Sequence, residues 1–83
     1  MPITGNQIKA ARALAGLTQE ELAERSKVGI NTIRNFEGRG VEVVRGRLDT
    51  MEAIKIALKA MGVDLLEDGQ PSTDGIGVRL RKP

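Results

Sequence analysis

The chain has 83 residues, with 13 Lys and Arg against 11 Asp and Glu, and a single aromatic residue, Phe36. A chain this short makes one domain that buries only about 60% of its unfolded surface, so we expect helices around an aliphatic core, with dimerisation adding stability. It contains neither Cys nor His, and no stretch approaches the roughly 18 apolar residues of a membrane span, so we expect a cytoplasmic protein with no disulfide, metal or cofactor.

The first predicted element is a helix over about residues 4–15. Thr4 and Gln7 have the spacing of a capping box, in which each side chain bonds the other residue's backbone N–H. Gly16 is the expected end of this helix. The apolar residues that recur at helical spacing and are expected to face the core are Ile8, Ala11 and Leu14.

A second helix is predicted over about residues 18–26. Thr18 followed by Glu21 is again a capping box, so the helix should begin there. Leu22 and Ala23 form its apolar side, and Ala23 is small enough to let another helix approach closely.

A third helix is predicted over about residues 30–37, with Gly29 as its N-cap and Gly38 at its end. Ile33 and Phe36 lie three residues apart and form its buried face. Its opposite face carries Ile30, Asn31, Arg34 and Asn35. Asn and Arg have the geometry to bond adenine and guanine edges in the major groove of DNA. The third helix is therefore predicted to be a recognition helix, joined to the second by a tight turn.

At this point the sequence resembles the XRE family, the phage-repressor-like helix-turn-helix regulators. The resemblance covers about residues 8–62, and TQEELAERS and the I-x-x-F-E-G run carry it most specifically. Ala23 and Ile33 fill two places typical of the family. The turn position, where the family usually has glycine, holds Lys27; this position commonly needs a positive φ, which strains other residues.

The resemblance also implies particular contacts with duplex DNA. At the start of the third helix, Ile30 would meet a thymine methyl group and Asn31 would pair with adenine. Arg34 would pair with guanine, and Asn35 with a base or a phosphate. Thr18 and Gln19 would hold a phosphate against the start of the second helix, where free N–H groups and the helix dipole favour an anion.

The loop over residues 38–47 is basic and punctuated by glycine, with a short extended piece expected over residues 41–44. Residues 25–47 hold six of the basic residues and only two of the acidic ones, a local charge of +4. This positive charge surrounds the predicted recognition helix, as phosphate binding requires. The candidate phosphate contacts in this loop are Arg39, Arg45 and Arg47.

A fourth helix is predicted over about residues 48–61, ending at Gly62. The residues expected to face the core are Leu48, Met51, Ile54, Leu58 and Met61. A second apolar side consists of Ala53, Ile56, Ala57 and Ala60. A short helix with two apolar sides is either central or covered by another element.

The cover is expected to be the tail, where residues 63–67 and 77–82 are predicted strands. The connection over residues 68–77 is rich in turn formers and is expected to be mobile. Either the hairpin packs against the fourth helix, or strands from two subunits join into one sheet. The candidate dimerisation residues are Val78 and Leu80 in the tail and Ile56 on the fourth helix.

We therefore predict a mostly α fold, a four-helix repressor-like helix-turn-helix domain (residues 1–62) with a C-terminal two-stranded β-hairpin (residues 63–83) that is a possible dimerisation element. The expected function is sequence-specific binding of double-stranded DNA as a homodimer that regulates transcription, with repression the expected mode. Two alternatives stay open, a DNA-binding antitoxin that captures a toxin and a protein-interaction module.

An enzyme is not expected, and no residue is predicted to be catalytic. The glycines of residues 74–78 precede no helix, which disfavours a phosphate-cradling loop. Asp64, Glu67 and Asp68 would be read as paired carboxylates or a cation site, yet they lie at a strand end beside a turn, where acidic residues are common for solubility.

Overall fold

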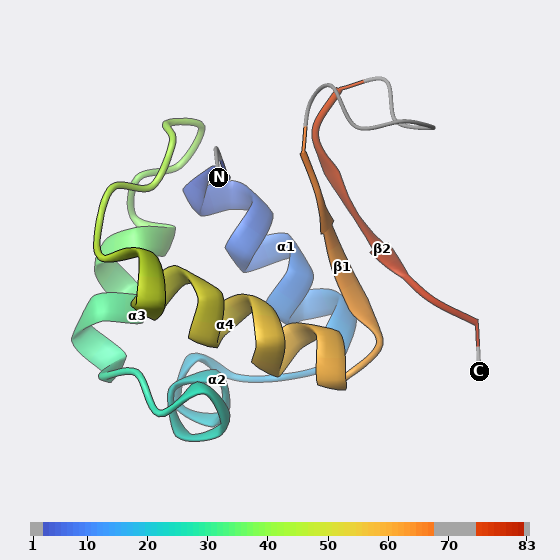
Figure 1. Cartoon of the computed structure of the whole chain (residues 1–83), viewed down its shortest axis with the longest axis horizontal. Coiled ribbons are helices and arrows are strands. Elements are labelled where there is room, and N and C mark those ends of the chain that lie inside the picture. The colour runs from blue at the N-terminus through green and yellow to red at the C-terminus, as the bar shows by residue number, and fades with distance from the viewer. Residues whose placement is uncertain (1–2, 68–74, 83) are drawn as a thin grey trace.

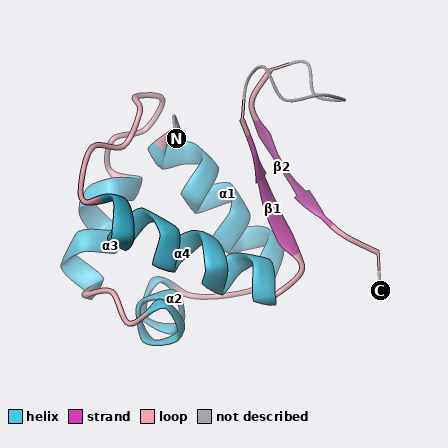
Figure 2. Cartoon of the chain, in the orientation of Figure 1, coloured by secondary structure: helices cyan, strands magenta, loops and turns pink. Residues whose placement is uncertain are grey.

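The computed structural model describes residues 3–67 and 75–82. Four helices pack around one core, and a two-stranded antiparallel hairpin lies along one side of them (Figures 1 and 2). The elements are α1 (Gly5–Ala15), α2 (Gln19–Ser26), α3 (Ile30–Glu37), α4 (Leu48–Ala60), β1 (Val63–Leu66) and β2 (Gly77–Leu80). The predicted fold is confirmed. Most of the connection predicted to be mobile, residues 68–74, lies outside the described residues.

Both predicted capping boxes are present. At α1, Gln7 N donates to Thr4 Oγ1 at 3.1 Å and Thr4 N donates to Gln7 Oε1 at 2.8 Å. At α2, the reciprocal bonds between Thr18 and Glu21 are 3.1 and 2.9 Å long. Each box satisfies N–H groups that a helix start otherwise leaves unpaired, which explains why these helices begin where they do.

The turn between α2 and α3 has the left-handed residue that the motif requires, although the residue is not glycine. Lys27 has φ 60° and ψ 28°, and Gly29 is the N-cap of α3. Lys27 N and Val28 N donate back to carbonyls of α2, and these bonds end that helix. The chain therefore reverses within three residues, which sets α3 across α2.

The core is aliphatic apart from Phe36. Its fully buried large side chains come from every helix, from β1 and from the N-terminal segment: Ile3, Ile8, Leu22, Ile33, Ile54, Leu58 and Val63. Ala11, Met51, Ala57 and Leu65 are also buried, so β1 belongs to the same core as the helices.

Two residues predicted to face the core do not lie in it. Leu14 is 42% exposed and Leu48 is 64% exposed. Each lies in a terminal turn of its helix, Leu14 in the last turn of α1 and Leu48 in the first turn of α4. Helical spacing indicates the side on which a residue lies, but not whether a neighbouring element extends far enough to cover it. Met61, which was also predicted to face the core, is half-buried and packs against it.

The hairpin packs against α1 as well as α4. β1 contacts both helices and β2 contacts α1. The side chain of Gln7 explains this arrangement, since its Nε2 donates to Leu66 O at 3.0 Å and to Gly77 O at 3.1 Å. The prediction that the hairpin covers α4 is thus correct for β1, whereas the packing of both strands on α1 was not predicted.

The loop after α3 is bonded to the start of α1. Val44 N donates to Ile3 O at 2.7 Å, and Thr4 and Val43 form an isolated antiparallel bridge. Gly5 N and Asn6 N donate to the carbonyls of Glu42 and Gly40. Of the extended piece predicted over residues 41–44, only Val43 and Val44 pair in this way, since residues 41 and 42 lie in a turn and a bend. These bonds hold the basic loop against the start of α1.

Candidate nucleic-acid interface

The two sides of α3 differ as a recognition helix requires. Ile33, Phe36 and Glu37 are buried, whereas Asn31, Arg34 and Asn35 are exposed. Ile30 is half-buried at the start of the helix. Within the described parts of the chain, the side chains of Asn31, Arg34 and Asn35 take part in no hydrogen bond or ion pair. All four predicted base-reading residues lie on α3. This helix is on the side of the fold away from the hairpin (Figure 1).

The start of α2 lies close to the end of α3. Thr18 Oγ1 accepts from Glu21 N, and Gln19 Nε2 donates to Glu37 Oε1 at 3.2 Å. Gln19 is therefore already engaged through its amide nitrogen. The backbone N–H of Thr18 lowers the pKa of the Glu21 carboxylate, and the Thr18 hydroxyl, which accepts from Glu21 N, also interacts with this carboxylate and helps to lower its pKa.

A buried ion pair supports the interface from behind. Glu37 accepts bonds from Arg12 Nε at 2.9 Å and Arg12 Nη2 at 3.0 Å, and its side chain is 5% exposed. Arg12 Nη1 also donates to Leu17 O. The hydrogen bond with Glu37 is the main cause that raises the pKa of Arg12 above its ordinary value.

The three loop arginines have different surroundings. Arg47 forms a two-bond ion pair with Asp49, with distances of 3.2 and 3.1 Å. Arg39 Nη2 lies 3.5 Å from Glu42 Oε2. Arg45 is exposed and forms no ion pair with any described residue. The predicted phosphate-binding residues thus lie in one loop beside α3, but two of them already have an acidic partner.

The remaining candidates lie on the other side of the fold. Ile56 and Leu80 are exposed, while Val78 packs against the core. Asp64 accepts from Arg79 at 3.1 Å and lies 3.6 Å from Arg81, and Glu67 is 3.9 Å from Lys55. Asp68 lies outside the described residues. Asp64 and Glu67 are therefore engaged with basic side chains, and the described residues contain no acidic cluster able to hold a metal ion.

None of the helices in the described residues is long and apolar enough to cross a membrane.

Comparison with known proteins agrees with this geometry. Residues 8–37, which run from α1 to the end of α3, match the model of a helix-turn-helix family. No curated protein matches the chain. The matched segment contains α2, the turn at Lys27 and the exposed side of α3. This match supports an XRE-like helix-turn-helix regulator, a family of DNA-binding proteins to which the chain is similar over these residues.

Proposed function

We propose that the protein is a sequence-specific repressor that reads the major groove of duplex DNA with α3. The observation that carries the proposal is the division of α3 into a buried side and an exposed polar side whose Asn and Arg groups are free of partners among the described residues. Polar groups that make no bonds within the protein are available for base edges. The protein would act in the cytoplasm.

Asn31 and Arg34 are the proposed sources of specificity. They lie three residues apart and so on the same side of α3. An Asn side chain suits the N6 and N7 edge of adenine, and an Arg side chain suits the O6 and N7 edge of guanine. Ile30 would add a contact with a thymine methyl group, and Asn35 a base or phosphate contact.

Phosphate contacts would flank these base contacts. Arg45 is the strongest candidate, because no described acidic residue neutralises it. Arg39 and Arg47 would bind a phosphate oxygen after leaving their ion pairs with Glu42 and Asp49. Thr18 and Gln19 would add contacts at the positive end of the α2 dipole. Such contacts fix the position of the protein on the duplex.

We further propose that two copies bind together. One α3 can read a half-site of about 4–6 base pairs, and a symmetric pair doubles the sequence read across sites one helical turn apart. Ile56 and Leu80 are the exposed members of the predicted dimerisation set. Ile56 shares α4 with the exposed Leu48, two turns away, and these residues line one hollow with Ala53. This row on α4 is the pairing surface we favour.

Selection of bound sequences from a pool of random duplexes tests the proposal. The expected result is a motif of two inverted half-sites about one helical turn apart, with adenine and guanine prominent in each. Recovery of unrelated sequences, bound no better than the starting pool, would contradict specific recognition. Enrichment of a single half-site would support α3 as the recognition helix and would contradict the proposed dimer.

A further inference from the structure

The outer edge of β2 has unused backbone groups. Arg81 N donates to Gly62 O at 2.8 Å, which fixes the alternation of bonds along the hairpin. Backbone hydrogen bonds are therefore exchanged within the pairs Asp64–Arg79 and Leu66–Gly77. The N–H and C=O groups of Val78 and Leu80, which lie in the other pairs, point away from β1. No described strand pairs with this edge. An edge of this kind is a template for another strand.

An apolar hollow adjoins this edge on the side of α1. It has a volume of about 250 Å³. Its lining residues are Thr4, Asn6, Gln7, Ala10, Val41, Ile76, Gly77 and Val78. Val41 is 81% exposed and Ile76 is 51% exposed. Leu14, also exposed, lies within about 20° of Gln7 around the axis of α1, on the side that faces the hairpin. A strand added to β2 would cover this apolar surface with every second side chain.

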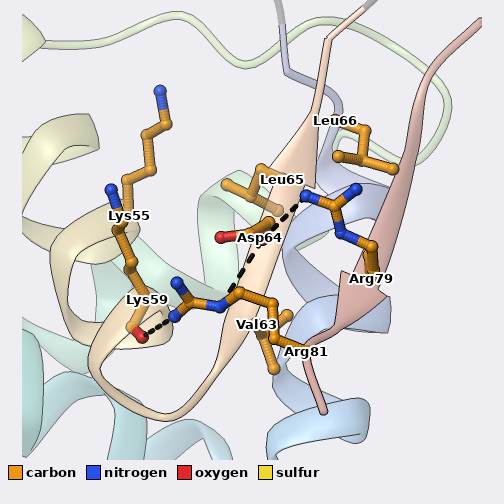
Figure 3. A pocket seen from close by; sticks show the side chains of 8 residues that line it. All are labelled: Lys55, Lys59, Val63, Asp64, Leu65, Leu66, Arg79 and Arg81. Carbon is orange, nitrogen blue, oxygen red and sulfur yellow. Dashed lines mark hydrogen bonds and ion pairs between the residues drawn. The ribbon is translucent and has the colours of Figure 1, made fainter. Parts of the chain in front are cut away.

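The other face of β2 is basic. Arg79 and Arg81 alternate with Val78 and Leu80, so their side chains lie on the face away from α1. Figure 3 shows both guanidinium groups extending over Asp64 toward α4, where Lys55 and Lys59 line the same pocket. Asp64 is thus paired with both arginines, and of the two lysines in the pocket Lys55 is paired with Glu67. Acidic side chains on an added strand would lie opposite Arg79 and Arg81 and complement this charge.

A second copy of β2 fits the edge poorly. In an antiparallel pair of identical edges, Val78 and Leu80 of each copy would supply the bonds between strands. The register that pairs Val78 with Leu80 sets Arg79 opposite Arg79, and the register centred on Leu80 sets Arg79 opposite Arg81, on the same face. Like charges that lie directly opposite destabilise a sheet. The register centred on Val78 sets Arg79 opposite Gly77, but it pairs Leu80 with Ile76, which lies outside β2. The charge of β2 therefore argues against the first two of these registers.

We propose that the outer edge of β2 binds an extended segment of another protein, in which apolar and acidic side chains alternate. The apolar side chains fill the hollow beside Ala10 and Ile76. The acidic side chains pair with Arg79 and Arg81, and the backbone of the bound segment forms hydrogen bonds with the backbone of Val78 and Leu80. This surface is separate from α3, so the proposal does not depend on DNA recognition.

A labelled nine-residue peptide of alternating Val and Glu is the probe, and fluorescence anisotropy with the full chain is the measurement. The expected result is saturable binding, with the Val-Lys peptide of the same length at least about tenfold weaker. N-methylation of one alternating set of backbone nitrogens should abolish binding, and methylation of the other set should not, because only one set faces β2. The amide signals of Val78 and Leu80 should shift on binding.

The double variant Arg79→Glu, Arg81→Glu should reverse the preference and bind the Val-Lys peptide better. If this variant does not fold, binding of the methylated peptides to the wild-type protein still tests the proposal. Equal binding of the Val-Glu and Val-Lys peptides, or binding that neither methylation affects, would overturn the proposal. It would also be overturned by a wild-type dimer that Leu80→Pro dissociates, since a second copy would then occupy the edge. A fall in the salt dependence of duplex binding in Arg79→Gln and Arg81→Gln would assign the surface to DNA instead.

Discussion

Glu37, the last residue of α3, accepts two hydrogen bonds from Arg12 of α1, at 2.9 and 3.0 Å. The same carboxylate accepts a bond from Gln19, at the start of α2. One buried carboxylate therefore links the three helices of the motif, and it fixes the end of the helix that we propose reads DNA. Removal of one member of such a pair leaves the other charge poorly compensated.

The first prediction concerns this ion pair. Glu37→Ala should lower the free energy of unfolding by about 2–3 kcal/mol, somewhat less than for a fully buried pair, because Arg12 retains some contact with water. Urea denaturation measures the change. The control is Asp49→Ala, which breaks the exposed pair with Arg47 and should change the free energy by less than about 1 kcal/mol. Equal effects of the two substitutions would mean that the buried pair has no special role.

The second prediction concerns the turn. Lys27 is the non-glycine residue with a positive φ among the described residues, so Lys27→Gly should stabilise the protein by about 0.5–1 kcal/mol. Gly16 ends α1 with φ 73°, and a Cβ there would meet no atom within 4 Å. Gly16→Ala should therefore destabilise by about 1 kcal/mol through the backbone alone. A melting temperature that fell in both variants would show that the backbone of Lys27 is unstrained.

The third prediction separates the loop arginines. Arg45→Gln should lower the slope of log K against log salt for duplex binding by about 0.9, the value for one lost phosphate contact. Arg39→Gln and Arg47→Gln should lower it less, because Glu42 and Asp49 already neutralise those side chains in part. The slope is measured on operator and on unrelated duplexes. An unchanged slope for Arg45→Gln would place the phosphate contacts elsewhere.

The fourth prediction concerns acid. The backbone N–H of Thr18, followed by its hydroxyl, lowers the pKa of Glu21 in the folded protein. A carboxylate with a lowered pKa stabilises the fold above its unfolded pKa of about 4.3, and this contribution is lost as the pH falls through the folded value. The melting temperature of Glu21→Gln should therefore lie below that of wild type at pH 6, and the gap should narrow toward pH 3. Glu24→Gln, which removes a negative charge from the same helix outside the capping box, is the control.

Local chemistry made much of this fold predictable. Thr4 with Gln7 and Thr18 with Glu21 mark two helix starts, and Gly16 marks a helix end, because capping depends on neighbours in the sequence. The position of α3 and its two sides also follow from spacing alone. The proposed base-reading set could be named from the sequence because its members lie within a single short helix.

What could not be predicted depends on contacts between distant parts of the chain. Gln7 bonds carbonyls 59 and 70 residues away, and no spacing rule indicates that this side chain docks the hairpin on α1. Leu14 and Leu48 have core spacing, yet no element among the described residues covers the helix turns in which they lie. The partners of Arg39 and Arg47 are close in the sequence, but basic charge alone does not show which arginines are neutralised.

The central claim is that α3 reads bases through Asn31 and Arg34. The most direct measurement compares the affinity of wild type, Asn31→Ala and Arg34→Ala for the selected operator and for a scrambled duplex at one salt concentration. Each variant should lose about 1–3 kcal/mol on the operator, and Asn31→Ala should bind the scrambled duplex as wild type does. Arg34→Ala should weaken binding to the scrambled duplex only slightly. Wild-type discrimination between the two duplexes in both variants would contradict the account.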